Sequence, residues 1–187
     1  LRKGESDADQ EFVSTFSIQN NVPFYSVKFD TKAFADDNKV SIQMAARQLR
    51  YEWFSEQALE HNIQYVLTAH HADDNLETFV INLSRGSGID GLTGIPATNG
   101  IIIRPLLPFS REELEDFAKS ELVEWREDSS NSSDNYLRNK VRHHLAPVLK
   151  EINPDFLKSI QETQKYLIQT NSMAEDAAVM VFQKVAQ

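Results

Sequence analysis

The sequence predicts an α/β protein built on a doubly wound parallel sheet with helices on both faces. Three short apolar segments, residues 22–30, 63–69 and 101–104, are rich in β-branched or aromatic residues and are expected to form strands. Segments with a helical repeat of apolar residues alternate with them, which is typical of parallel strands joined by crossover helices.

The second and third predicted strands favour a parallel sheet in particular. Residues 63–69 (IQYVLTA) and 101–104 (IIIR) are continuous apolar runs rather than alternations of apolar and polar residues. Such runs suit strands that are covered on both faces, as they are in parallel sheets. Pro105 and Pro108 should end the third strand, because proline cannot donate to a strand ladder.

Helices are predicted between and after these strands. Residues 40–61 and about 73–84 each carry apolar side chains at helical spacing. Ser110 and Glu113 form the pattern of a capping box, so a third helix should begin there. A fourth is expected from its apolar stripe of Leu137, Val141, Leu145 and Val148.

The chain is expected to contain one domain and an extension. Residues 1–150 are predicted to form an α/β domain, and residues 151–187 a helical linker or the start of a following domain. The segment after Pro154 has no glycine or proline, so one or two long helices are predicted. We expect the chain to be cut at both ends: LRKGESDADQ leads into a helix without a preceding strand, and FQKVAQ lacks a helix stop signal.

Composition excludes several classes of function. The net charge of −9 argues against non-specific binding of nucleic acid by the chain as a whole. The absence of cysteine removes disulfides, thiolate chemistry, cysteine-ligated zinc and iron–sulfur clusters. No apolar run is long enough for a membrane span, and the polar, acidic start is unlike a signal or transit peptide. A cytoplasmic location is therefore expected.

An acidic cluster follows the second predicted strand. Asp73, Asp74 and Glu77 fall at the start of a helix, directly after His70 and His71. Acidic residues in a first turn are favoured by the helix dipole, by ~0.3–1 kcal/mol each, so one or two would need no other cause. Three acids after two histidines exceed that need, and they should face away from the apolar stripe at the carboxyl edge of the sheet, where ligands bind. We therefore predict ligands for Mg²⁺ or for a substrate amine.

The glycine-rich segment that follows is not a dinucleotide site. GSGIDG, residues 86–91, matches G-x-G-x-x-G but comes after a predicted helix, whereas a dinucleotide fingerprint follows a strand. The pattern instead indicates a helix stop and a tight loop, or a loop that a ligand approaches closely. Arg85 and Gly86 are accordingly candidate substrate-binding residues.

An arginine pair is the second candidate site feature. Arg138 and Arg142 lie one helical turn apart, and paired guanidinium groups suit a phosphate or a carboxylate. The alternative is an ordinary solvated helix face. Zinc is disfavoured because the sequence has neither cysteine nor an H-E-x-x-H motif, and His143 and His144 are expected at a helix edge.

Six segments in order, AHHADDNLET, RGSGIDGL, IIIRPLL, SREEL, WREDSSN and YLRNKVRHHLAPVL, closely resemble the tRNA(Ile)-lysidine synthetase family. The resemblance covers about residues 1–149, with a weaker match of the trailing helices to the family's linker. It implies the fold of the N-type ATP pyrophosphatases of the PP-loop superfamily. It also implies adenylation of the C2 oxygen of the wobble cytidine in tRNA(Ile) with a CAU anticodon. The ε-amine of free L-lysine then displaces AMP, giving lysidine.

The resemblance also implies roles for the candidate residues. Asp74 and Glu77 would hold and orient the lysine amine, with His70, Arg85 and Gly86 in the lysine or ATP site. Asp73 would help to bind Mg²⁺ or ATP, although the sequence does not decide which carboxylate meets the metal. The implied charge-stabilising groups for the phosphates or the adenylated intermediate are Arg138 and Arg142. A homodimer is possible.

The family's phosphate-binding S-G-G-x-D-S loop is not found in this sequence. We therefore expect an initial βαβ unit, of roughly 30 or more residues, to be missing, which would leave this chain inactive alone. Two other functions stay open, a tRNA 2-thiolation enzyme of the same superfamily and a non-catalytic domain that binds RNA or a partner. The first commonly uses cysteines, and the clustering of acids with arginines weighs against the second. If the interpretation is right, Glu77 and Arg142 should converge at one edge of the sheet and form one pocket for an amine and an anion.

Overall fold

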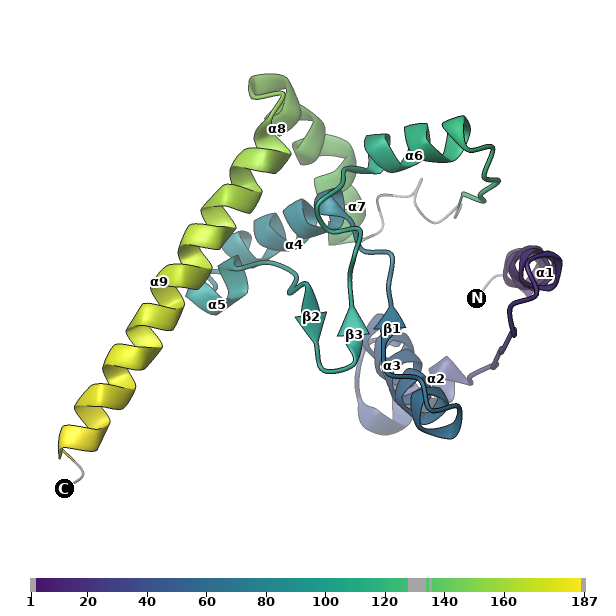
Figure 1. Ribbon diagram of the computed structural model, residues 1–187, viewed down its shortest axis with the longest axis horizontal. Coiled ribbons are helices and arrows are strands. Elements are labelled where there is room, and N and C mark those ends of the chain that lie inside the picture. The colour runs from purple at the N-terminus through teal and green to yellow at the C-terminus, as the bar shows by residue number, and fades with distance from the viewer. Residues whose placement is uncertain (1–2, 128–133, 135, 186–187) are drawn as a thin grey trace. The chain divides into compact units, whose positions relative to one another are not determined.

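The computed structural model describes residues 3–127, 134 and 136–185, and the chain divides into two compact units, Leu1–Gln64 and Tyr65–Gln187 (Figure 1). The predicted domain boundary near residue 150 stays a prediction, and the helix beyond it packs within the second unit.

The first unit consists of three helices, α1 (Lys3–Gln19), α2 (Thr31–Asn38) and α3 (Ile42–Glu60). Side-chain caps start two of them: the Asp30 carboxylate accepts from the backbone of α2, and the Ser41 hydroxyl accepts from that of α3. Helices α2 and α3 pack together, and each buries an alanine. Helix α3 confirms the helix predicted over residues 40–61, whereas α2 was not predicted.

The strand predicted over residues 22–30 is wrong, because this segment has no regular structure. A strand needs a neighbour for its backbone groups, and the described part of the first unit contains no strand that could pair with it. The alternating large side chains of Val22, Tyr25, Val27 and Phe29 are left exposed. The residue types favoured a strand, but the local chain supplies no partner.

The second unit contains a three-stranded sheet in the order β1-β3-β2. Strands β1 (Val66–Leu67) and β3 (Ile102–Ile103) are parallel, which confirms the α/β prediction. Strand β2 (Thr98–Asn99), which was not predicted, pairs antiparallel with β3, so the sheet is mixed rather than wholly parallel. The turn between them begins at Gly100, whose φ of 58° is one that glycine adopts without strain.

The predicted helices after the second strand, after Ser110 and after Tyr136 are all confirmed. One long helix follows Pro154. The described helices are α4 (Ala72–Ser84), α5 (Ile89–Leu92), α6 (Arg111–Ser120), α7 (Leu137–Lys140), a π-helical turn (Val141–Leu145), α8 (Ala146–Ile152) and α9 (Phe156–Val185). Helices α4, α6, α7 and α8 lie beyond one end of the strands in the second unit, and α9 runs along one side (Figure 1).

The π-helical turn makes α7 and α8 one interrupted helical run. Ala146 N donates to Val141 O, five residues earlier, instead of four. Pro147 comes next and has no N–H to donate back into the turn, so the regular ladder cannot continue through this point. The basic side chains before and after the π-helical turn therefore do not point in the directions that an uninterrupted α-helix would give them.

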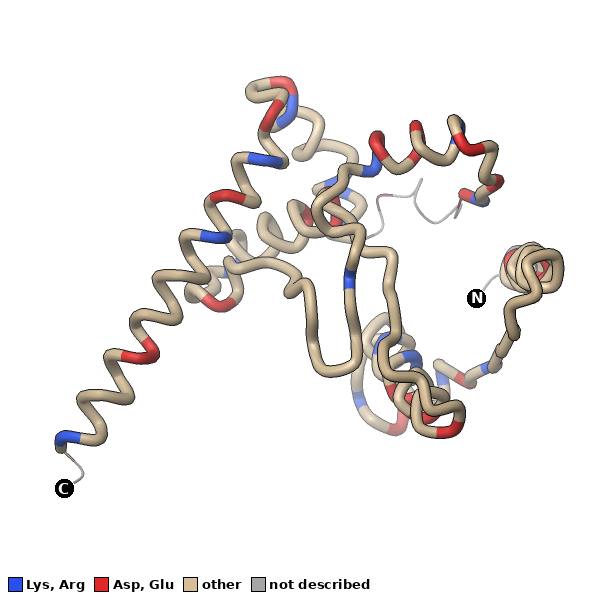
Figure 2. The backbone as a smooth tube through the Cα atoms, viewed as in Figure 1, with Lys and Arg blue, Asp and Glu red and all other residues tan. Residues whose placement is uncertain are grey.

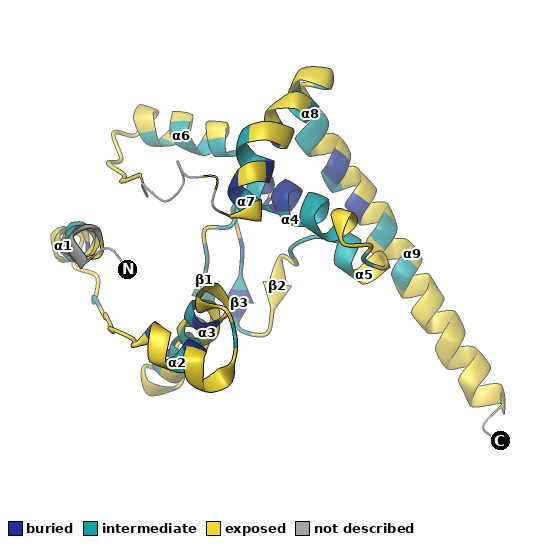
Figure 3. Ribbon diagram, turned by 180° about the vertical axis from the view of Figure 1, so that it is seen from behind, coloured by how far each residue is buried: buried dark blue, intermediate teal, exposed yellow. Residues whose placement is uncertain are grey.

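The core of the second unit lies where α4, α8 and α9 meet. Leu76, Ala146 and Ile160 are buried there, and aromatic and aliphatic side chains from the same helices pack around them. Figure 3 shows that buried positions gather on α4 and on the first half of α9, while the second half of α9 is exposed. Within the described residues, no helix combines the length and apolar character of a membrane span.

A buried polar contact fixes α4 to α9. Asn75 Nδ2 donates to Gln164 Oε1 at 2.6 Å, and Ile95 N donates to Asn75 Oδ1 at 2.7 Å. Gly94 lies against both side chains with a φ of 82°, and a Cβ at this position would come within 2.2 Å of Asn75 Oδ1. The loop after α5 can thus approach α4 only because residue 94 is glycine.

Candidate active site

The candidate site begins where β1 leads into α4. Residues 68–71 connect the end of the strand to the first turn of the helix, and Thr68 Oγ1 lies 3.0 Å from His70 Nδ1. Asp73 and Asp74 occupy that first turn, and His71 N donates to Asp74 Oδ2 at 3.2 Å. The acids therefore lie at the carboxyl end of a parallel strand, as the sequence predicted.

Glu77 and the two arginines form one hydrogen-bonded cluster. Arg138 Nε donates to Glu77 Oε2 at 2.7 Å, and Arg142 Nε donates to Glu77 Oε1 at 2.6 Å. Arg142 Nη2 also lies 3.2 Å from Oε2. Glu77 was expected to face away from the apolar stripe, but its side chain is only 1% exposed because the arginines enclose it.

Asp74 lies at the edge of this cluster. Arg142 Nη2 is 3.5 Å from Asp74 Oδ1, and Arg138 Nη2 donates to the Asp74 carbonyl oxygen at 3.1 Å. Arg138 also reaches Thr78 Oγ1 at 3.2 Å. The acids of α4 thus lie beside the basic residues of α7 and the π-helical turn, and Figure 2 shows red and blue positions meeting there. The predicted approach of Glu77 to Arg142 is confirmed, and the pocket expected there for an amine and an anion stays a prediction.

The electrostatics keep Arg142 charged. Burial alone would lower its pKa, but the hydrogen bond to Glu77 and the negative charges of Glu77 and Asp74 outweigh that effect and raise the pKa above its ordinary value. A guanidinium held in this way is a fixed positive charge at the carboxyl edge of the strand.

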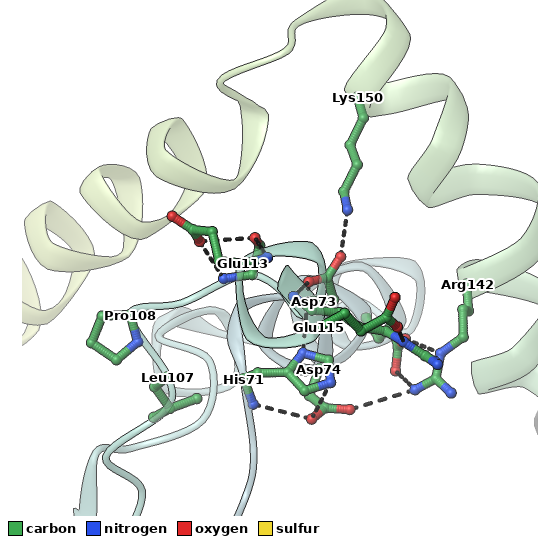
Figure 4. A network of polar contacts seen from close by, with 12 residues as sticks. His71, Asp73, Asp74, Leu107, Pro108, Glu113, Glu115, Arg142 and Lys150 are labelled. Carbon is green, nitrogen blue, oxygen red and sulfur yellow. Dashed lines mark hydrogen bonds and ion pairs between the residues drawn. The ribbon is translucent and has the colours of Figure 1, made fainter. Parts of the chain in front are cut away.

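Asp73 belongs to a neighbouring set of contacts, shown in Figure 4. Lys150 Nζ donates to Asp73 Oδ1, and Arg111 N donates to Asp73 Oδ2 at 2.7 Å. Burial would raise the pKa of Asp73, but the neighbouring His71 imidazole, 3.6 Å away, and the hydrogen bonds from Lys150 and the backbone of Arg111 outweigh it. The pKa of Asp73 is therefore well below its ordinary value, and the carboxylate stays ionised.

Lys150 and the backbone of Arg111 were missed by the sequence interpretation. The available signal for Lys150 was its spacing, eight residues after Arg142 on a predicted helix. Nothing in the sequence connects Asp73 to Arg111, because that contact depends on where α6 begins in space.

The structure does not bring Arg85 and Gly86 to the acidic cluster. They follow the C-terminus of α4, whose 13 residues put about 20 Å between its two ends. Gly86 has a φ of 73° and donates to Leu83 O, so the predicted helix stop is confirmed. A role for this pair in binding substrate stays a prediction.

The predicted role of Asp73 as a Mg²⁺ ligand stays a prediction. Both carboxylate oxygens already accept hydrogen bonds from the protein, and a divalent ion would lie beside the Lys150 ammonium group. Among residues 3–127, 134 and 136–185, no three histidines or carboxylates are grouped so that they could hold a metal.

Part of the WREDSSN motif lies outside the described residues, namely positions 128–131. Its first part is described: Trp125 Nε1 donates to Glu127 Oε1 at 3.2 Å, and Arg111 Nη2 lies 2.8 Å from Glu127 Oε2. This segment is therefore tied to the start of α6, next to Asp73.

Comparison with known proteins agrees with this fold. The family model of the PP-loop domain matches residues 1–149, and the chain belongs to this family. It is 46% identical over 168 residues to the tRNA(Ile)-lysidine synthase of Porphyromonas gingivalis, covering 89% of this chain and 37% of that protein. Identity is 41% over 184 residues to the enzyme of that name from Parabacteroides distasonis, with 98% of this chain and 41% of the relative covered.

More distant relatives carry the same name. The tRNA(Ile)-lysidine synthase of Geobacillus kaustophilus is 34% identical over 191 residues, which cover all of this chain and 41% of that protein. The chain thus spans about two fifths of the length of these curated relatives. The family resemblance found in the sequence is confirmed.

Proposed function

We propose that this chain is part of the catalytic domain of a tRNA(Ile)-lysidine synthase. The enzyme would use ATP to adenylate the C2 oxygen of the wobble cytidine in tRNA(Ile) with a CAU anticodon. Free lysine would then attack C2, so that a C–N bond forms, the C2–O bond breaks, and AMP and a proton leave. The observation that carries the proposal is the anchoring of Arg138 and Arg142 on buried Glu77, beside Asp74 at the carboxyl edge of β1.

The contacts support different roles for Glu77 and Asp74. Both oxygens of Glu77 are engaged by guanidinium groups, so Glu77 acts as the anchor that orients the arginines. Asp74 interacts with Arg142 at a longer distance, 3.5 Å, and its side chain is 16% exposed. Asp74 is therefore the better of the two predicted acids to receive the lysine ammonium group and hold the amine near the carbon it attacks.

The arginines supply positive charge where negative charge develops. The side chain of Arg138 is 41% exposed, and no described residue accepts a hydrogen bond from its Nη1 atom. That donor can reach a phosphate oxygen while Nε stays on Glu77. Preorganised donors of this kind stabilise the charge that builds up as diphosphate or AMP departs. ATP is the substrate that provides those phosphates, and none of the described residues is assigned to Mg²⁺.

The test is lysine incorporation by the full-length protein. Purified protein is incubated with a tRNA(Ile) transcript carrying CAU, ATP, Mg²⁺ and radiolabelled lysine, and label in the tRNA and AMP release are measured. Asp74→Asn should raise the KM for lysine at least tenfold, because the substitution removes about one charge-assisted contact to the lysine amine. Asp155→Asn, at an exposed ion pair, is the matched control.

Other outcomes point elsewhere. Sulfur transfer to the tRNA without lysine incorporation would identify a 2-thiolation enzyme, and tRNA binding without AMP release would identify a binding domain. Unchanged lysine kinetics in Asp74→Asn would remove the role of that residue. The expectations of a cytoplasmic location and of a homodimer stay predictions.

A further inference from the structure

We infer that Asp73 is a positioning residue whose carboxylate joins three helices and thereby sets the position of the arginine pair, and that it does not bind Mg²⁺. The inference rests on the proposed function only for its activity measurement. Its other measurements concern the folded protein and Mg²⁺ alone.

The first link joins α4 to α8. Lys150 Nζ donates to Asp73 Oδ1, and the two side chains are 37% and 15% exposed. A charge-assisted hydrogen bond in a partly buried place is stronger than a surface ion pair, because less water competes for either group.

The second link joins α4 to the start of α6. Arg111 N, in the first turn of α6, has no acceptor within its own helix and donates instead to Asp73 Oδ2 at 2.7 Å. The capping box of Ser110 and Glu113 satisfies other donors at this end, so Asp73 completes the cap from another helix. Ala72 N donates to Phe109 O at 2.8 Å beside it, which makes the junction a two-point contact.

These links determine where Arg142 lies. Helix α4 contacts the interrupted run of α7 and α8 through Glu77 at one place and through Asp73 at another, four residues away. The contacts at Glu77 and at Asp73 are separated along α4 and along the run of α7 and α8. Together they prevent this run from rotating about either contact. Because Arg142 lies within the π-helical turn and Lys150 follows it, a regular α-helical spacing would not by itself keep both side chains directed at α4.

The same contacts leave Asp73 unsuited to a metal. Each oxygen already accepts from a protein donor, and a cation bound there would be repelled by the neighbouring ammonium group of Lys150.

A double-mutant cycle in the full-length protein tests the junction. Asp73→Asn, Lys150→Met and the double variant are unfolded in urea, with Lys158→Met as the control at an exposed pair. The two substitutions should be coupled by about tenfold in the unfolding equilibrium constant, because the second costs little once the first is made. Lys150→Arg, which keeps the charge, should restore most of the stability lost in Lys150→Met. Additive effects, with coupling under about twofold, would overturn the junction.

Mg²⁺ separates positioning from metal binding. Asp73→Asn and Lys150→Met should each lower kcat by about tenfold through misplacement of Arg142, and leave the half-saturating Mg²⁺ concentration within about twofold. A tenfold rise in that concentration in Asp73→Asn, with none in Lys150→Met, would show a metal ligand and overturn the inference. If the protein forms no lysidine, calorimetric titration with Mg²⁺ alone replaces the kinetic measurement. The absence of lysidine would contradict the proposed function, whereas the titration would still test whether Asp73 binds Mg²⁺.

Discussion

Glu77 and Arg142 lie in direct contact, with Arg142 Nε 2.6 Å from Glu77 Oε1, although 65 residues separate them in the chain. Arg138 engages the other oxygen of the same carboxylate. One buried acid therefore holds two arginines in a defined geometry, and the stability of this cluster and the proposed chemistry depend on the same contacts.

Removing the charge of Glu77 should destabilise the protein strongly. Glu77→Gln keeps the shape of the side chain but leaves two guanidinium groups without their carboxylate, and we expect a loss of about 3 kcal/mol in the free energy of unfolding. Asp155→Asn at the exposed pair with Lys158 should cost no more than about 0.5 kcal/mol. Urea unfolding of the two variants measures the difference, and equal losses would mean that the arginines do not depend on Glu77.

We expect turnover to require the guanidinium group of Arg142 and not only its positive charge. Lysine has a single ammonium group and cannot donate to both Glu77 oxygens while also facing Asp74, as Arg142 does. We expect Arg142→Lys to lower kcat for lysidine formation by about 10²-fold and to change the KM for lysine much less. Lys140→Met, at an exposed position on the same helical run, is the control. Full activity in Arg142→Lys would show that a point charge is enough.

Gly94→Ala should disrupt the junction of α4 with α9. The new Cβ would meet Asn75 Oδ1 and Gln164 Nε2 at 2.2 and 2.3 Å, in addition to the backbone strain of a φ of 82°. We expect a loss of about 3 kcal/mol or more from the clash, the strain and the broken hydrogen bonds. Gly100→Ala isolates the backbone effect, because its φ is 58° and nothing lies within 4 Å, and it should cost about 1 kcal/mol. Similar losses at the two positions would contradict the close approach.

Asp73 should make stability depend on acid pH. Its pKa in the folded protein is lowered from the ordinary 3.8, so the unfolded chain takes up a proton there before the folded protein does. This contribution is complete above about pH 5 and is lost as the pH falls through the lowered pKa. The free energy of unfolding should be measured at several pH values below 5. Its dependence on pH should be weaker in Asp73→Asn, by an amount that corresponds to up to one proton. An unchanged slope would mean that Asp73 has the same pKa in both states.

The local features of the fold followed from the sequence because their causes are local. Helix α4 and the capping box at Ser110 depend on side chains within one or two turns, and both were predicted close to their observed bounds. The strand expected over residues 22–30 failed because residue preference does not provide a pairing partner. The hairpin strand β2 was missed because its two residues carry too short a pattern to recognise.

The sequence by itself determined the family, the order of the main helices, and the acidic and arginine groups that belong to the site. It could also suggest that Glu77 and Arg142 meet, because both were placed at one edge of a sheet. Only the tertiary structure decided that Glu77 is buried as an anchor, and that Asp73 is bound by Lys150 and by the start of α6. The physical reason is that a carboxylate can accept from any donor that reaches it. Which donors do so depends on how separate helices pack, and no short stretch of sequence encodes that packing.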